Sequence, residues 1–99
     1  FIDRNNFQQT GSSDEIMNLS NLKDKLISFG WNTIEIDGHN INEISNALHL
    51  RKEGKPTAII ANTIKGKGFS FSENNNSWHH AVLTKSTYEK AVAELENYE

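Results

Sequence analysis

The spacing of apolar residues changes along the chain and separates predicted helices from predicted strands. The first stretch with helical spacing contains Leu19, Leu22, Leu26 and Phe29. Residues three or four positions apart share one face of a helix, so this stretch is expected to be an amphipathic helix. Asn18 or Ser20 can cap its start, and Gly30 can end it because glycine tolerates the left-handed conformation found at many helix ends.

A strand and a second helix are predicted next. Between residues 31 and 36 apolar and polar residues alternate, with Ile34 and Ile36 on one face, and this period of two predicts a strand. Asn40 with Glu43 three residues later is a capping-box pattern and predicts the start of a helix. The apolar face of that helix contains Ile41, Ile44 and Leu48, and its end is marked by Gly54 and Pro56.

The second half of the chain predicts a buried strand, a long loop and a last helix. Residues 57–64 include the uninterrupted apolar run 58–61, which is typical of a strand covered on both faces in a parallel sheet. Residues 65–81 are expected to form a loop, after which Ser86 with Glu89 predicts the cap of a final helix. The order strand, helix, strand indicates an α/β fold, as part of a parallel sheet with helices on both faces.

Composition matters mainly through what it excludes. The formal net charge is −3 at pH 7, so the chain lacks the basic surface typical of nucleic acid binding. The chain contains no cysteine, which excludes disulfides and cysteine-ligated metals. No apolar run approaches the roughly 20 residues that cross a bilayer, and no secretory signal is recognisable. A cytoplasmic protein without membrane or nucleic acid partners is expected.

The composition also indicates a core that is shared with other parts of a protein. Hydrophobic residues make up 35% of the 99 residues and the mean hydropathy is −0.65, which is low for a chain that must fill its own interior. The chain opens with Phe1, Ile2 and Asp3, which is typical of the end of a strand within a longer polypeptide. Residues 1–99 are therefore expected to be an incomplete domain.

Two predicted loops contain side chains suited to chemistry. Oxygen atoms in Asp3–Phe7, directly after the first strand end, are hard donors that suit Mg²⁺ or Ca²⁺, although asparagine in such a turn more commonly bonds its own backbone. In the second loop His79 and His80 follow Trp78. Adjacent histidines point in different directions, so proton transfer or a phosphate contact suits one of them better than a shared metal, and a solvated imidazole is the alternative.

The remaining glycines and histidines favour structural explanations. Gly66 and Gly68, each preceded by lysine, fit either a bend at the exit of a strand or a phosphate cradle, and they lack the third glycine and helix start of the usual phosphate motifs. His39 and His49 are typical of structural or surface positions.

Taken in order, these segments resemble the thiamine-diphosphate-binding domain of transketolases. The matching strings are DRNNFQQTG at 3–11, FGWN at 29–32, IDGH at 36–39, KPT at 55–57, NTIKGKG at 62–68 and WHHAVL at 78–83. The resemblance covers nearly the whole chain and is closest to the bacterial form that has a separate N-terminal subunit. It implies that residues 1–99 are the C-terminal portion of this domain, with the Gly-Asp-Gly half of the metal motif further upstream.

The resemblance also implies roles for individual residues. The Asn5 side chain and the Phe7 backbone carbonyl would ligate the divalent metal, Mg²⁺ or Ca²⁺, that bridges the cofactor diphosphate. Ile64 would lie near the cofactor. His80 would be the catalytic and cofactor-binding imidazole that faces the diphosphate and the substrate channel, and Ala81 stands after it where the family usually has glycine.

The activity implied by the resemblance is the transfer of a two-carbon ketol unit between sugar phosphates, as in pentose phosphate metabolism. This segment alone is expected to be inactive, because the rest of its domain and a pyrimidine-binding domain or subunit complete the site in a homodimer or heterotetramer. Two alternatives stay open: another thiamine-diphosphate enzyme similar to deoxyxylulose-phosphate synthase, or a non-catalytic α/β interaction module.

Overall fold

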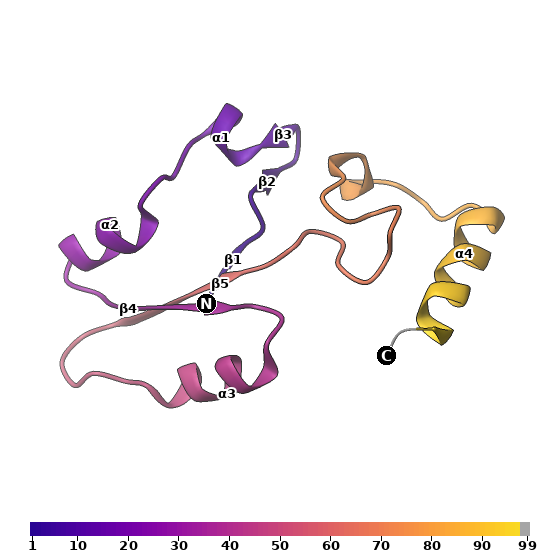
Figure 1. The fold of residues 1–99 in the computed structure, drawn as a ribbon. Coiled ribbons are helices and arrows are strands. Elements are labelled where there is room, and N and C mark those ends of the chain that lie inside the picture. The colour runs from indigo at the N-terminus through magenta and orange to yellow at the C-terminus, as the bar shows by residue number, and fades with distance from the viewer. Residues whose placement is uncertain (98–99) are drawn as a thin grey trace.

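The computed structural model describes residues 1–97 of the chain. Its elements are β1 (Ile2–Arg4), β2 (Phe7–Gln8), β3 (Gly11–Ser12), α1 (Ser13–Ile16), α2 (Leu22–Ser28), β4 (Asn32–Asp37), α3 (Ile41–His49), β5 (Thr57–Asn62), the 3-10 turn η1 (Asn76–His79) and α4 (Lys85–Glu96). The chain combines a parallel sheet with helices, and α3 connects the parallel strands β4 and β5, which confirms the predicted α/β class (Figure 1).

The main sheet has three parallel strands in the order β1-β5-β4. Its central strand is β5, which pairs Ile2 with Ile60 on one side and Ile34 with Ile59 on the other. A strand with neighbours on both edges and cover on both faces has little contact with water, and Ile60 is accordingly fully buried. The continuous apolar run of this strand therefore has the structural cause that the sequence predicted.

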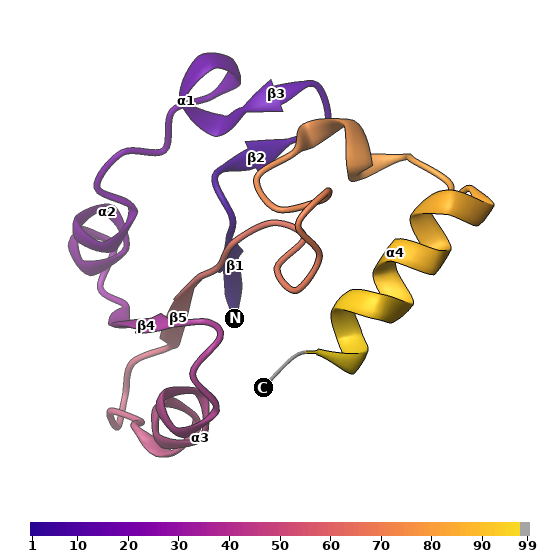
Figure 2. The ribbon, with the colours of Figure 1, turned by 45° about the vertical axis from the view of Figure 1, so that its right-hand side comes forward.

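Two helices cover the sheet from opposite sides. Ile36 on β4 and Ile59 on β5 form the core with Ala47 on α3. The side of the sheet that carries Ile36 and Ile59 is thus packed against α3, as the period of two predicts. On the other side of β4 lies α2, and both views separate the two helices in this way (Figure 1 and Figure 2).

The predicted start of α2 is wrong, and its predicted end is correct. Its N-cap is Asn21, in the left-handed conformation with φ 53° and no capping bond from its side chain, so the predicted caps Asn18 and Ser20 are wrong. Asn18 instead accepts the N–H of Ser20 at 2.6 Å, which makes a local turn before the helix. Gly30 ends the helix as predicted, with φ 87°.

The predicted cap of α4 is also wrong. The helix begins two residues earlier than Ser86 suggests, with Thr84 as N-cap. The hydroxyl oxygen of Thr84 accepts the N–H of Thr87 at 3.2 Å, and the hydroxyl oxygen of Thr87 accepts the N–H of Thr84 at 2.8 Å. This is a capping box in which threonine takes the place of the expected glutamate, so a pattern restricted to Glu or Gln selected the wrong serine.

The chain has an open shape with much apolar surface. The radius of gyration is 16.6 Å, against about 13 Å for a compact domain of 100 residues. Exposed large apolar side chains include Phe1, Phe29, Ile41, Val82, Tyr88 and Leu95. In Figure 2, α4 stands apart from the sheet and is connected to it by the loop that follows β5. Among the described helices, none is long and apolar enough to cross a bilayer.

Candidate functional site

The candidate residues follow the carboxyl ends of the three parallel strands, where ligands of open α/β sheets bind. These ends are tied together by backbone bonds. The N–H of Gly38, after β4, donates to the carbonyl of Asn62 at 2.8 Å, and the N–H of Thr63, after β5, donates to the carbonyl of Arg4 on β1 at 3.1 Å. The loops that carry Asn5 and Ile64 therefore start from one rigid edge.

Asn5 makes the local turn that its sequence context predicted. Its side-chain oxygen Oδ1 accepts the N–H of Phe7 at 2.9 Å, and Asn6 between them has φ 63°. This bond fixes the orientation of the Asn5 amide. Because a carbonyl oxygen has two lone pairs, Oδ1 can still bind a cation while it accepts this bond.

The carbonyl of Phe7 lies on the same side as the Asn5 amide. In the β2–β3 hairpin Phe7 faces Ser12, and the N–H of Ser13 donates to the carbonyl of Asn6 at 2.8 Å. Because this bond joins the neighbouring pair of residues, Phe7 and Ser12 are a non-hydrogen-bonded pair of the antiparallel ladder. In such a pair the N–H and the carbonyl of Phe7 both point away from β3. Since the N–H meets Oδ1 of Asn5 there, two oxygen donors share the outer edge of the hairpin.

His80 belongs to the second loop but contacts the first. Its Nε2 lies 3.2 Å from Nε2 of Gln9, four residues beyond Asn5. Asn76 in η1 supports this contact by donating to the carbonyl of Gln9 at 3.2 Å. The His80 side chain is exposed, and its ring meets the ring of His79 edge-on with the centroids 4.5 Å apart. The two loops expected to form one site are thus brought together through Gln9.

Ile64 follows β5 and lines a hollow of about 890 Å³. Its side chain is 37% exposed, and its N–H donates to Nε2 of His39 at 2.8 Å. After it the chain bends at Gly66 and Gly68, with φ values of 70° and 103°. The bend that the sequence allowed at these glycines is therefore present.

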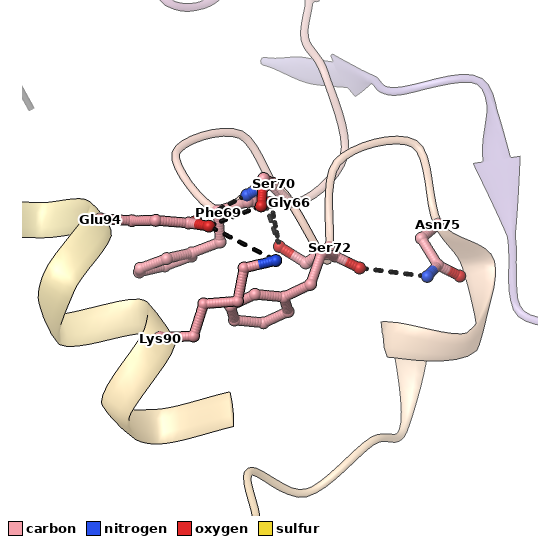
Figure 3. Close-up of polar contacts among 8 residues, drawn as sticks. Gly66, Phe69, Ser70, Ser72, Asn75, Lys90 and Glu94 are labelled. Atoms are coloured by element: carbon pink, nitrogen blue, oxygen red, sulfur yellow. Dashed lines mark hydrogen bonds and ion pairs between the residues drawn. The ribbon is translucent and has the colours of Figure 1, made fainter. Parts of the chain in front are cut away.

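Helix α4 holds the second loop in place (Figure 3). The carboxylate of Glu94 accepts both the N–H and the hydroxyl of Ser70, at 2.8 and 2.5 Å. The nearby ammonium of Lys90 lies 3.7 Å from this carboxylate and 5.6 Å from the centroid of the Phe71 ring. The hydrogen bonds from Ser70, with the charge of Lys90, lower the pKa of Glu94.

The interior of the second loop is also bonded, as the dashed lines in Figure 3 show. The buried hydroxyl of Ser72 donates to the carbonyl of Gly66 at 2.9 Å, and Asn75 donates to the carbonyl of Phe71 at 3.1 Å. The ring of Phe71 packs on Trp78, with the ring centroids 4.9 Å apart, and Trp78 directly precedes His79 and His80 in the chain. Residues 65–81 are therefore an ordered loop that links α4 to the imidazoles.

The described residues contain two suitable oxygen donors but no complete metal site. Within residues 1–97 there is no group of three or more His, Asp or Glu that could hold a metal ion. Magnesium takes six ligands, usually with at least one carboxylate and phosphate oxygens of the substrate. Asn5 and Phe7 can thus supply part of a metal site, which agrees with the partial motif in the sequence.

Comparison with known proteins identifies the family. Residues 1–96 match the family model described as "Transketolase, thiamine diphosphate binding domain". The chain is 48% identical over 98 residues to the 6-deoxy-6-sulfo-D-fructose transketolase subunit SqwG of Clostridium sp. (strain MSTE9). It is 38% identical over 96 residues to one subunit of the apulose-4-phosphate transketolase of Phocaeicola vulgatus.

A solved structure agrees with these relatives. The crystal structure of transketolase from Campylobacter jejuni matches 95% of this chain with a TM-score of 0.82 and 32% sequence identity. The match covers 15% of that chain, and the matches to the two subunits cover 36% and 34% of their lengths, so this chain spans about a third of those subunits. Its sequence and fold show that the chain belongs to the transketolase family, in the thiamine-diphosphate-binding domain.

Proposed function

We propose that these residues form part of a transketolase that transfers a two-carbon ketol unit between sugar phosphates. The observation that carries the proposal is the convergence of the Asn5–Phe7 donors and His80 at one edge of the sheet, through the 3.2 Å contact between Gln9 and His80. A carboxyl-end edge with oxygen donors and an imidazole suits an anionic ligand bound through a metal. Thiamine diphosphate, when bound, would supply the electron sink for this chemistry.

The donor geometry supports the proposed metal ligands. Oδ1 of Asn5 and the carbonyl of Phe7 share the outer edge of the hairpin and are neutral hard oxygens, which suits Mg²⁺ or Ca²⁺ bound to a diphosphate. A main-chain carbonyl serves equally well whatever side chain position 7 carries. Position 7 therefore tolerates phenylalanine without loss of the donor.

We assign the proton-transfer role to His80. Its exposed imidazole can donate and accept near neutral pH, and Gln9 holds one ring nitrogen. Ile64, partly exposed beside the hollow at the strand ends, offers an apolar contact for the cofactor. His80 would thus act at the diphosphate and substrate, while Ile64 would only bind.

Other polypeptide is needed to complete the site. Large apolar side chains are left exposed, and the described residues offer only part of a metal site. The two relatives named above are called subunits. We therefore propose that these residues are the C-terminal portion of their domain, that they function with a pyrimidine-binding domain or subunit, and that they are inactive alone.

The test is a substitution of Asn5 in the complete protein with its partner. Asn5→Leu should weaken the metal-dependent binding of thiamine diphosphate, measured by calorimetry, by at least about tenfold. Asn5→Asp keeps an oxygen donor and should retain most of the affinity. Asn42→Leu, at an exposed position of α3, is the matched control. Unchanged affinity in Asn5→Leu would favour a non-catalytic interaction module instead.

The donor sugar is a separate question. The relative with 48% identity is named for 6-deoxy-6-sulfo-D-fructose, so a modified ketose is a second candidate beside ordinary sugar phosphates. Turnover of xylulose 5-phosphate with ribose 5-phosphate, compared with turnover of 6-deoxy-6-sulfo-D-fructose, would separate the two. Turnover of neither donor would instead favour another thiamine-diphosphate enzyme, such as one similar to deoxyxylulose-phosphate synthase.

A further inference from the structure

The ends of β4 and β5 are joined by a contact that continues the sheet beyond its last backbone bond. Along β5 the bonds alternate between its two neighbours. Asn62 bonds to Gly38 on the β4 side, and Thr63 bonds to Arg4 on the β1 side. The amide of Ile64 should next find an acceptor on the β4 side, but there the chain has already turned toward α3.

The side chain of His39 takes the place of that missing acceptor. The N–H of Ile64 donates to Nε2 of His39 at 2.8 Å. The backbone of His39 is itself held by Asp37, whose carboxylate accepts the His39 N–H at 2.9 Å. Asn40 follows and caps α3 by accepting the N–H of Glu43 at 3.2 Å. The imidazole is therefore presented by a turn that is bonded before and after it.

Close packing at Gly38 prevents this turn from shifting. A Cβ at position 38 would overlap the Thr63 side chain and lie 3.1 Å from the Cβ of Ala61. The turn after β4 thus lies directly against the end of β5. His39 can reach Ile64 because no side chain separates the two segments.

We propose that His39 is a positioning residue, whose neutral imidazole holds the amide of Ile64 and fixes the start of the bend at Gly66. The inference rests on the proposed function, in which Ile64 contacts thiamine diphosphate. An imidazole that accepts at Nε2 must carry its proton on Nδ1, so one tautomer is required. On its other side the carbonyl of Ile64 accepts the N–H of Lys67 at 3.2 Å.

The hydrogen bond between the Ile64 amide and His39 lies beside a hollow in which a ligand would bind. His39, Ile64 and Gly66 line the same hollow at the strand ends. Without the imidazole the amide of Ile64 loses its partner, and the bend starts from a residue held at its carbonyl alone. Because His39 is exposed, water can partly replace the lost bond, and the expected effect is about twofold to tenfold.

The test compares three variants of the complete protein. His39→Leu removes the acceptor, His39→Gln offers a side-chain oxygen in its place, and His49→Leu is the matched control. His49 is a second histidine that does not line the hollow, and its Nδ1 lies 2.7 Å from the carbonyl oxygen of Ser45 in its own helix. The readouts are amide exchange at Ile64 without cofactor, the Kd for thiamine diphosphate, and the nitrogen shifts of the His39 ring.

The expected results distinguish this role from a general loss of stability. His39→Leu should speed exchange at Ile64 and raise the Kd by about twofold to tenfold each, while His39→Gln restores both and His49→Leu changes neither. The wild-type ring should show its proton on Nδ1. A Kd and exchange rate in His39→Leu equal to wild type, or a proton on Nε2, would overturn the proposal. If these results hold but no ketol transfer occurs, the proposed function alone fails.

Discussion

Gly66 provides a test of how tightly the second loop is packed. Gly54 and Gly66 have nearly equal φ angles, 71° and 70°, but different surroundings. A Cβ at Gly54 would meet no atom within 4 Å, whereas a Cβ at Gly66 would overlap the carbonyl oxygen of Ser72 and lie 2.7 Å from its carbonyl carbon. Alanine would adopt a similar positive φ at both sites but would overlap other atoms only at position 66.

The expected destabilisation can be estimated for each site. The left-handed conformation costs a residue with a Cβ about 1–2 kcal/mol, which applies to both variants. Overpacking against the backbone adds about 1–3 kcal/mol at Gly66 only. Since 1.4 kcal/mol is tenfold, Gly66→Ala should increase the opening of its surroundings about 5- to 150-fold beyond the shared strain.

Urea unfolding of the complete protein without cofactor measures the two free energies. Amide exchange locates the damage, because the N–H groups of Ser72 and Asn74 are bonded within the loop, to Phe69 and Lys65. Exchange at these two amides should rise in Gly66→Ala and remain unchanged in Gly54→Ala. Equal unfolding free energies for the two variants would refute the close approach of Gly66 to Ser72.

Three further predictions concern α4 and the cofactor. Because Ser70 lowers the pKa of Glu94, their contact should be complete above pH 4.5, the usual carboxyl pKa, and be lost as the pH falls through the lowered value. Amide exchange at Ser70 measures this loss, and Glu94→Gln should remove its pH dependence. An unchanged pH profile in Glu94→Gln would contradict the assignment. Thr84→Ala should cost α4 about 1 kcal/mol of local stability by amide exchange, with Ser86→Ala nearly neutral, and the reverse order would restore the sequence-based cap. The 99-residue chain alone should bind thiamine diphosphate poorly, and micromolar, metal-dependent binding in calorimetry would disagree.

The sequence predicted the fold where one period dominates. The run at residues 58–61 and the alternation through Ile34 and Ile36 both correspond to observed strands. A strand buried on both faces is apolar throughout, and a strand buried on one face alternates between apolar and polar residues. The helix starts were less predictable. Several polar residues near each start can cap, and the sequence pattern did not distinguish Asn21 and Thr84 from their polar neighbours.

For the candidate site, local features were predictable and long-range contacts were not. The Asn5 turn involves neighbours two positions apart, so residue type and spacing sufficed. His39 and Glu94 were missed as contact residues because their partners, Ile64 and Ser70, lie more than twenty positions away. Nothing in the sequence pairs such residues, and only the path of the sheet and of the second loop brings them together.

The position of β1 has a consequence for the order of folding. This strand leads into the oxygen donors at Asn5 and Phe7, yet it pairs with the distant strand β5, with Ile2 opposite Ile60. During synthesis β4, α3 and β5 can assemble from nearby segments, whereas β1 cannot pair with β5 until β5 has left the ribosome, since distant pairings form late. The loop that carries Asn5 and Phe7 would then acquire its final geometry only after β5 is made, and a chain interrupted before residue 57 would leave the β5-facing edge of β1 unpaired.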